Sequence, residues 1–239
     1  MNETRELTTY ERERSDRLNR WRKPLVSRRD RWGAWANMVF ADHGFIRLVY
    51  LNEHRISENA WRSAQPAPWD LRRLSRKGLR SVINLRGGQS YGSLPLEQET
   101  CEELGLQFEV FVLRSRALPA VSDILAAKAL FERLEYPVLF HCKSGADRAG
   151  LMCGLFMVLH EGAPVREARK QLSAKYGHIR HGKTGVLDTM FDAYLEDHPD
   201  EDTPFLEWIE TRYDPERLTA GFRPTGIGSF ITETLLRRE

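Results

Sequence analysis

Strand-like and helix-like segments alternate along the middle of this 239-residue chain, and the alternation predicts an α/β fold. Short apolar, β-branched runs such as Val82–Leu85 and Val138–Phe140 are typical of buried strands. Stretches of helical length separate these runs, and two of the stretches end at a glycine, Gly78 and Gly105, as helices commonly do. We therefore expect a central, mainly parallel sheet flanked by helices, with ligands at the carboxyl ends of its strands.

The same signals give the order of the expected elements. Up to the central cysteine the pattern predicts a strand around 55–63, a helix from Trp69 to Lys77, a strand around 80–85, a helix over 94–104, a strand over 106–113, a helix over 120–135 and a strand that ends at Cys142. Three helices are then expected over 149–161, 165–176 and 185–196. The first is apolar nearly all round, which indicates a buried helix, and Gly162 and Pro164 end it.

The composition fits one catalytic domain with extensions at both ends. Because 41% of the residues are hydrophobic and 10% are aromatic, the chain can bury a sizeable core. We divide it into a basic and aromatic N-terminal extension (1–51), a catalytic domain (52–198) and a C-terminal tail (199–239), and we expect helical extensions. A net charge of +2 gives no reason to expect a nucleic-acid partner.

The segment HCKSGADRAG, residues 141–150, places Cys142 at a strand end and Arg148 six residues later, at the start of a helix. Backbone N–H groups of residues 143–148 can therefore converge with the positive end of the helix dipole to hold an anion. The same field favours the thiolate of Cys142, and the planar guanidinium of Arg148 matches two phosphate oxygens. The pattern predicts a phosphate-binding loop that carries a nucleophile, whereas a lone cysteine is more often a small core residue, as we expect for Cys101 and Cys153.

This loop resembles the active-site loop of the cysteine-dependent protein tyrosine phosphatases, in particular their bacterial dual-specificity and lipid-phosphatase-like branch. Two upstream segments extend the likeness: AWRSAQP (60–66) is similar to the first strand of bacterial members, and VINLR (82–86) to their second. The resemblance covers about residues 54–195 and implies a dual-specificity-phosphatase-like fold.

The resemblance also implies residue roles. Cys142 would attack phosphorus, and Arg148 would hold the phosphoryl oxygens together with the loop amides of Lys143, Ser144, Gly145 and Ala146. Water would then hydrolyse a cysteinyl-phosphate. The ring of His141 would order the loop and tune the thiolate, although His141 also fits a core histidine at a strand end. No metal or cofactor is implied.

Two departures from the family pattern concern the chemistry. The residue after the arginine is usually Ser or Thr, whose hydroxyl helps the thiolate to leave, but here it is Ala149, so we expect slow breakdown of the phosphoenzyme. The general acid is usually an aspartate in the loop that here reads RSRALP (114–119), without a carboxylate. Protonation of a poor leaving group is worth about 100-fold to 10,000-fold.

Two aspartates are candidates for the missing acid. Asp147 lies inside the phosphate loop, where myotubularin-like lipid phosphatases also carry Asp, and we favour it; an intraloop clamp is the alternative role. Asp123 lies just beyond the expected loop, but it also fits an ordinary position in the first turn of a helix, where it complements the dipole.

Basic residues are expected at the rim of the pocket. Lys143 lies within the loop, Arg114 and Arg116 in the neighbouring loop, and His178 and Arg180 after a later helix. A basic rim suits polyanions such as an inositol phosphate or a phosphorylated lipid, whereas a phosphotyrosine or phosphoserine protein needs fewer cations. The other interpretation is a solvated basic face, and the substrate stays open at this point.

The N-terminal extension carries six basic residues against Asp30 within 20–31, followed by the aromatic and apolar segment 32–51. This order fits a segment that binds a membrane surface, but we favour a helical extension packed on the catalytic domain or on a second copy. It is too short and polar to span a bilayer, and no apolar core of a signal peptide precedes it. Three unevenly spaced cysteines indicate a reducing compartment, so we expect the cytoplasm, peripherally on the inner membrane face if the segment binds membrane.

Three functions are therefore considered for the chain. The favoured one is a cysteine-dependent phosphatase acting on a phosphomonoester. The missing loop aspartate and Ala149 also fit a weak phosphatase fold that binds phosphorylated partners. A scaffold that docks through its N-terminal extension is the third.

Overall fold

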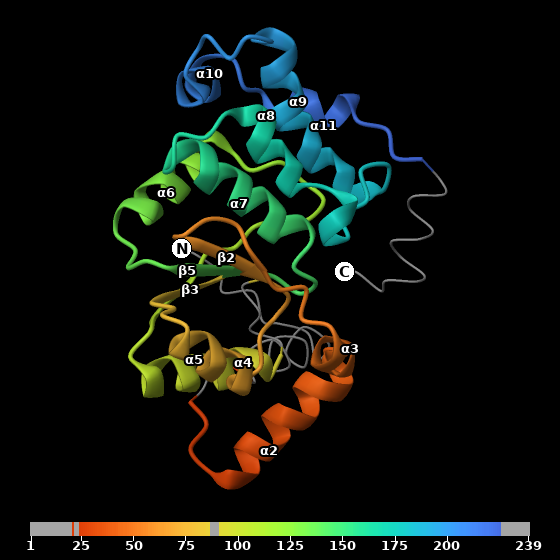
Figure 1. Ribbon diagram of the computed structural model, residues 1–239. Helices are drawn as coiled ribbons and strands as arrows, with labels where there is room; N and C mark the ends of the chain where they lie inside the picture. The colour runs from red at the N-terminus through yellow and green to blue at the C-terminus, as the bar shows by residue number, and fades with distance from the viewer. Residues whose placement is uncertain (1–20, 22–23, 87–90, 226–239) are drawn as a thin grey trace, which may run out of the picture.

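The computed structural model describes residues 21, 24–86 and 91–225, and a five-stranded sheet lies at the centre of this part (Figure 1). The strands, in the spatial order β1-β2-β5-β3-β4, are β1 (His54–Arg55), β2 (Ala60–Ser63), β5 (Val138–His141), β3 (Ser81–Asn84) and β4 (Gln107–Val110). All neighbouring pairs are parallel except β1 with β2. The mainly parallel α/β sheet predicted from the sequence is confirmed.

The strand expected around 55–63 is in fact the antiparallel pair β1 and β2. A tight turn separates them, because the N–H groups of Ile56 and Ser57 both donate to the carbonyl of Ala60. The Ser57 hydroxyl also accepts the N–H groups of Asn59 and Ala60. A serine that bonds the backbone two and three residues ahead favours a turn over a continuous strand.

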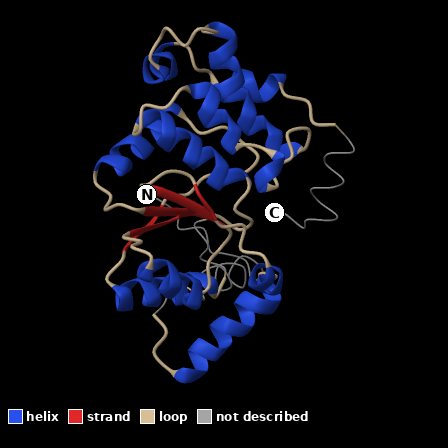
Figure 2. Cartoon of the chain, in the orientation of Figure 1, coloured by secondary structure: helices blue, strands red, loops and turns tan. Residues whose placement is uncertain are grey.

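Helices cover both faces of the sheet (Figure 2). On one face lie α2 (Arg28–Ala36), η1 (Asn37–Ala41), α3 (Gly44–Val49), α4 (Pro68–Arg76) and α5 (Ser93–Leu104). On the other lie α6 (Val121–Glu132), α7 (Asp147–Leu159), α8 (Val165–Ala168), η2 (Arg169–Gln171), η3 (Ala174–Tyr176), η4 (Lys183–Leu187), α9 (Asp188–Asp197), α10 (Phe205–Thr211) and α11 (Pro215–Gly221). No helix in the described ranges combines the length and the apolar character needed to cross a bilayer.

The alternation of side chains along β5 divides the core into two layers. Val138 and Phe140 face the larger layer under α6 and α7, and Leu139 faces the smaller layer under α4 and α5. All three side chains are fully buried, as expected for the central strand of a parallel sheet. The larger layer continues into the C-terminal segment, where α10 adds Trp208 and Ile209.

A third apolar cluster attaches the N-terminal helices to the rest of the chain. Trp21, Ala34 and Met38 pack there against Leu96 of α5, among other side chains. The backbones approach closely, since a side chain at Gly92 would clash with the Ala34 carbonyl, and the Gly92 N–H donates to Asn37 Oδ1 at 2.8 Å. Residues 24–49 therefore form a helical extension packed on the α/β domain.

The contribution of the C-terminal segment to the core can be measured at Ile209. We expect Ile209→Ala to lower the free energy of unfolding by about 2–5 kcal/mol, because it removes a fully buried side chain from the larger layer. Leu125→Ala, at an exposed position of α6, should change it by less than about 0.5 kcal/mol. Denaturant unfolding checks both; equal small effects would show that the C-terminal segment adds nothing to the core.

Candidate active site

In the loop between β5 and α7, the backbone carbonyls of Lys143 and Ser144 accept hydrogen bonds from residues outside the loop. The Gln65 N–H donates to the carbonyl of Lys143 at 3.4 Å, and Asn52 Nδ2 donates to that of Ser144 at 3.0 Å. Asn52 also binds the carbonyl of Tyr176, so its buried amide joins two distant segments.

Arg62, which is completely buried on β2, holds the next two carbonyls. One of its terminal nitrogens donates to the carbonyls of Gly145 and Ala146, at 2.8 and 2.9 Å. The other donates to the carbonyl and the side-chain oxygen of Gln171. The guanidinium also lies over the Tyr176 ring, 4.0 Å from its centroid. The helix expected over 165–176 is instead divided into α8, η2 and η3, and the Gln171 carbonyl at the end of η2 accepts from Arg62 and not from a later residue of a continuous helix.

The outward carbonyls determine where the amides of the loop point. In a trans peptide the N–H group points opposite to the carbonyl. Four consecutive carbonyls, from Lys143 to Ala146, accept bonds from outside the loop. The N–H groups of the same peptides, from Ser144 to Asp147, are therefore directed into the loop, next to the N-terminus of α7, where that of Ala146 donates to Ser144 Oγ at 3.4 Å. This is the arrangement that binds an anion.

Gly145 is required by both conformation and space. Its φ of +73° lies in the left-handed region, and a Cβ would stand 2.6 Å from backbone atoms of Ser63 and Ala64. The loop therefore rests directly on the end of β2.

Cys142 and Arg148 lie at the two ends of this loop. Cys142 follows the last residue of β5 and is 1% exposed, whereas Arg148 is in the first turn of α7 and is 6% exposed. Strand and helix thus bring Cys142 and Arg148 to the two ends of one loop. Such a set of groups can bind a phosphoryl group and attack it.

His141 has a carboxylate partner that the sequence does not reveal. Its Nε2 lies 2.6 Å from Oε1 of Glu97, and both side chains are completely buried. The other Glu97 oxygen accepts from Asn84 Nδ2 at 2.7 Å and from Gln65 Nε2 at 3.0 Å. Glu97 comes from α5, so the residue before the cysteine is positioned from the opposite side of the sheet.

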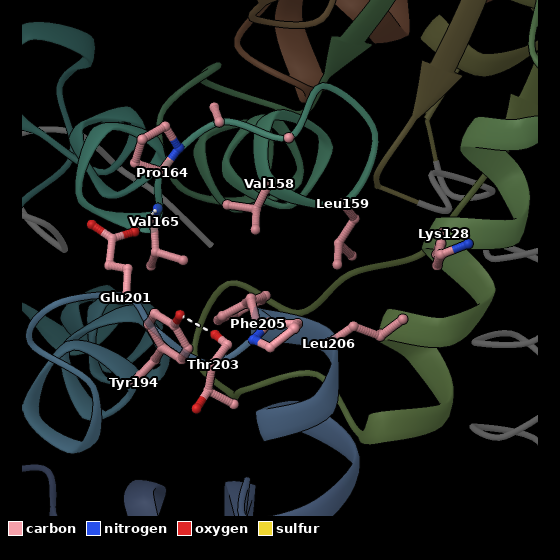
Figure 3. A pocket seen from close by; sticks show the side chains of 13 residues that line it. Lys128, Val158, Leu159, Pro164, Val165, Tyr194, Glu201, Thr203, Phe205 and Leu206 are labelled. Carbon is pink, nitrogen blue, oxygen red and sulfur yellow. Dashed lines mark hydrogen bonds between the residues drawn. The ribbon is translucent and has the colours of Figure 1, made fainter.

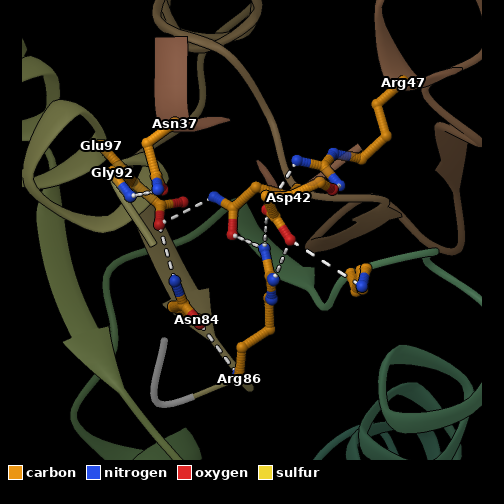
Figure 4. Close-up of polar contacts among 9 residues, drawn as sticks. Asn37, Asp42, Arg47, Asn84, Arg86, Gly92 and Glu97 are labelled. Atoms are coloured by element: carbon orange, nitrogen blue, oxygen red, sulfur yellow. Dashed lines mark hydrogen bonds and ion pairs between the residues drawn. The ribbon is translucent and has the colours of Figure 1, made fainter. Parts of the chain in front are cut away.

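A buried ion cluster connects the N-terminal extension with the loop (Figure 4). Asp42 accepts two hydrogen bonds from Arg86, at 2.7 and 2.8 Å, and one from Arg47 at 2.7 Å. Lys143 Nζ lies 3.9 Å from the same carboxylate. Burial alone would raise the pKa of Asp42, but the three cations outweigh it and hold the pKa below its ordinary value.

His178 is buried behind the loop, and the rim position expected for it is wrong. Its Nδ1 lies 2.7 Å from Asp147 Oδ1 and its Nε2 lies 2.7 Å from Asp188 Oδ2. Burial would lower the pKa of the ring, but the hydrogen bonds of the two carboxylates raise it to about 9. His178 is therefore an imidazolium at neutral pH, and Asp147 is bound to it.

The remaining predicted residues lie on exposed elements. Arg180 pairs with Asp192 of α9 at 2.5 Å, and Asp123 accepts the Ala120 N–H at 3.0 Å within the first turn of α6. Arg114 and Arg116 are exposed in the connection between β4 and α6. Within the described ranges, no group of three His, Cys, Asp or Glu side chains is arranged to hold a metal ion.

A separate hollow of about 400 Å³ lies at the other end of α7 (Figure 3). Val158, Leu159 and Phe205 line it, among others, and its walls are mostly apolar. Because α7 has 13 residues at 1.5 Å per residue, this hollow is about 18 Å from the phosphate loop. It is therefore not part of the candidate active site.

Comparison with known families agrees with this geometry. Residues 52–167 match the family model described as the tyrosine phosphatase family. The match contains the loop with Cys142 and Arg148 and the strands that hold it. This region, just under half of the chain, is therefore similar to the tyrosine phosphatase family.

Solved structures of phosphatases show a distant likeness. Tk-PTP in its active form is 21% identical, with 62% of this chain and 99% of that chain covered and a TM-score of 0.49. A putative phosphatase from Shewanella putrefaciens is 19% identical over 62% and 94%, with a TM-score of 0.48. TpbA from P. aeruginosa is 16% identical over 71% and 89%, with a TM-score of 0.44. The comparison with curated proteins found no match.

The His178 contacts predict a pH-dependent stability. Since the pKa of His178 is about 9 in the folded chain against an ordinary 6.5, protonated His178 stabilises the fold fully below about pH 6.5. This stabilisation, on the order of 3 kcal/mol, is lost as the pH rises through about 9. Between about pH 6.5 and pH 9 the free energy of unfolding should therefore fall by on the order of 3 kcal/mol less in His178→Gln than in wild type. Denaturant unfolding across the range measures it, with the exposed His181→Gln as the control; a wild-type pH dependence in His178→Gln would contradict the assignment.

Proposed function

We propose that this chain is a phosphomonoester hydrolase that works through a cysteinyl-phosphate. The observation that supports this is the ring of inward amides between Cys142 and Arg148. In the first step the Cys142 sulfur attacks phosphorus, the bond to the leaving oxygen breaks, and that oxygen takes up a proton. In the second step water attacks the phosphorus, the sulfur–phosphorus bond breaks, and inorganic phosphate and a proton are released.

Asp147 and His178 together are our proposal for the general acid. His178 Nδ1 lies 2.7 Å from Asp147 Oδ1, and Asp147 directly precedes Arg148 in the loop. The imidazolium proton of His178 can pass to Asp147 and from there to the leaving oxygen, which leaves a neutral His178 beside the Asp147 carboxylate until the proton released in the second step restores the imidazolium. The alternative is a clamp, in which the ion pair only fixes the start of α7, and the buried Asp188 contact supports that role equally.

The substrate carries a phosphate, and the charges near the loop bear on its class. Lys143 is partly exposed next to Cys142, and Arg86 lies buried beside it in the Asp42 cluster. These cations attract anions, which favours an anionic phosphorylated lipid or an inositol phosphate as the substrate. A phosphotyrosine or phosphoserine protein is also compatible with them. The three reduced and buried cysteines support a location in the cytoplasm.

A phosphate-dependent binding module is the second candidate. Ala149 is fully buried behind the loop and offers no hydroxyl to help the thiolate leave. A loop that turns over poorly would mainly bind phosphorylated partners through its amides and Arg148.

Substitution of the cysteine tests the enzyme proposal. Cys142→Ser should abolish hydrolysis of p-nitrophenyl phosphate and keep binding of inorganic phosphate, because the amides and Arg148 remain. Cys153→Ser is the matched control, since burial raises the pKa of that thiol to about 12 and it should keep full activity. Phosphate release, titration of phosphate binding and mass spectrometry of acid-quenched enzyme make these measurements. Wild type that neither turns over nor forms a phosphoenzyme would be a binding module.

The leaving group tests the acid. We expect Asp147→Asn and His178→Gln to slow hydrolysis of an alkyl phosphate by about 100-fold or more, because an alkoxide needs a proton. The same variants should slow p-nitrophenyl phosphate far less. Asp123→Asn is the control and should change neither rate by much. Steady-state rates with both substrates decide; equal losses on the two substrates would assign Asp147 and His178 to the clamp role.

A further inference from the structure

Exposed apolar side chains are concentrated in one segment of the chain. Of the ten large hydrophobic side chains that are exposed in the described part, six lie within residues 26–50. They are Val26, Trp32, Phe40, Phe45, Val49 and Tyr50, and we call them the aromatic patch. Trp32 is 76% exposed, Phe40 75% and Val49 90%. Single exposed apolar residues are ordinary, but this many in 25 residues indicates a binding surface.

The patch lies on the helix face opposite to the one that packs on the domain. Ala34 and Met38, four residues apart, are buried against α5, whereas Trp32 and Phe40 point away from it. In Figure 1 the outer side of α2 faces away from the sheet and from α5. The apolar residues of this outer face therefore do not contribute to the core of the described chain.

The patch also borders the active site. The Tyr50 hydroxyl donates to Asn52 Oδ1 at 3.2 Å, and Asn52 in turn holds the Ser144 carbonyl of the phosphate loop. Asp42, between Phe40 and Phe45, contacts Lys143. The Tyr50 end of the aromatic patch thus lies close to the phosphate loop.

Positive charge accompanies the apolar side chains. Arg28 and Arg29 are exposed on α2, and Arg28 lines a cleft of about 350 Å³ with Trp32, Trp35 and Trp69. Trp35 and Trp69 stack with ring centroids 5.0 Å apart, so this cleft has a firm aromatic wall. Residues 20–31 hold six basic side chains against one acidic one. Tryptophan and phenylalanine next to arginine match the interface of an anionic bilayer, where rings enter the acyl boundary and cations meet headgroups.

We propose that the aromatic patch, together with Arg28 and Arg29, is a docking surface for a membrane that contains anionic lipids. The charge complementarity favours this occupant over a second copy of the chain, whose own patch would bring like charges together. The proposal does not depend on catalysis, because the side chains of the patch lie outside the loop.

Vesicle sedimentation tests this surface in the full chain. Wild type should sediment with vesicles of phosphatidylcholine and phosphatidylglycerol in equal parts, and bind much less to phosphatidylcholine alone. The double variant Trp32→Ser and Phe40→Ser should bind the anionic vesicles at least roughly tenfold more weakly, because each ring removed from water stabilises the bound state. The matched control, Val112→Ser with Leu125→Ser, removes two exposed apolar side chains elsewhere and should bind like wild type.

Two further measurements make the outcome decisive. Hydrolysis of p-nitrophenyl phosphate should be equal in wild type and in the Trp32 and Phe40 double variant, which shows that the variant is folded. A wild type that binds vesicles but hydrolyses nothing would refute the phosphatase proposal and support the docking surface. Wild type that stays in the supernatant, or a double variant that binds equally, would overturn the docking surface. So would a dimer in sedimentation equilibrium that the double variant loses, because the patch would then belong to a second copy.

Discussion

The buried guanidinium of Arg62 is the interaction on which the phosphate loop depends. A loop that surrounds an anion must turn its carbonyls outward, and outward carbonyls inside a protein need donors. Arg62 supplies donors to two loop carbonyls and to Gln171, and burial lowers the pKa of its guanidinium without removing its charge. The amides are therefore oriented before any phosphate arrives, so binding does not have to reorganise them.

Two buried carboxylates near the loop, those of Asp42 and Asp147, are each bound to cationic side chains. The Asp42 carboxylate binds Arg86 and Arg47, which fixes these cations beside the loop. The Asp147 carboxylate binds the imidazolium of His178. The interior, with its low dielectric, strongly disfavours a single buried charge. In both cases the partner of opposite charge offsets this penalty. The N-terminal helices and the segment after α8 thus contribute to the electrostatics of one site.

The parts of the site that could be predicted from the sequence are the local ones. The order of a strand end, a cysteine, a glycine and a helix start within 141–150 predicts the loop. The alternation of strand-like and helix-like segments predicts the sheet. The partners of the loop come from far away without a motif, as Glu97 and Asp42 do. Sequence shows that His178 is basic but not that it is buried, which explains the wrong rim position. The prediction of one helix over 165–176 was wrong because Arg62, which binds the Gln171 carbonyl, lies 109 residues earlier in the chain.

The chain order of the groups that hold the loop has a consequence during synthesis. Asn52 and Arg62 leave the ribosome before Cys142, whereas His178 and Asp188 leave it later. A nascent chain that has reached residue 160 already holds the cysteine, the arginine and the donors of the loop carbonyls. It lacks His178, so the donors of the loop carbonyls are present before Asp147 can meet its imidazolium. The order of synthesis thus separates the groups that shape the loop from the group that binds Asp147.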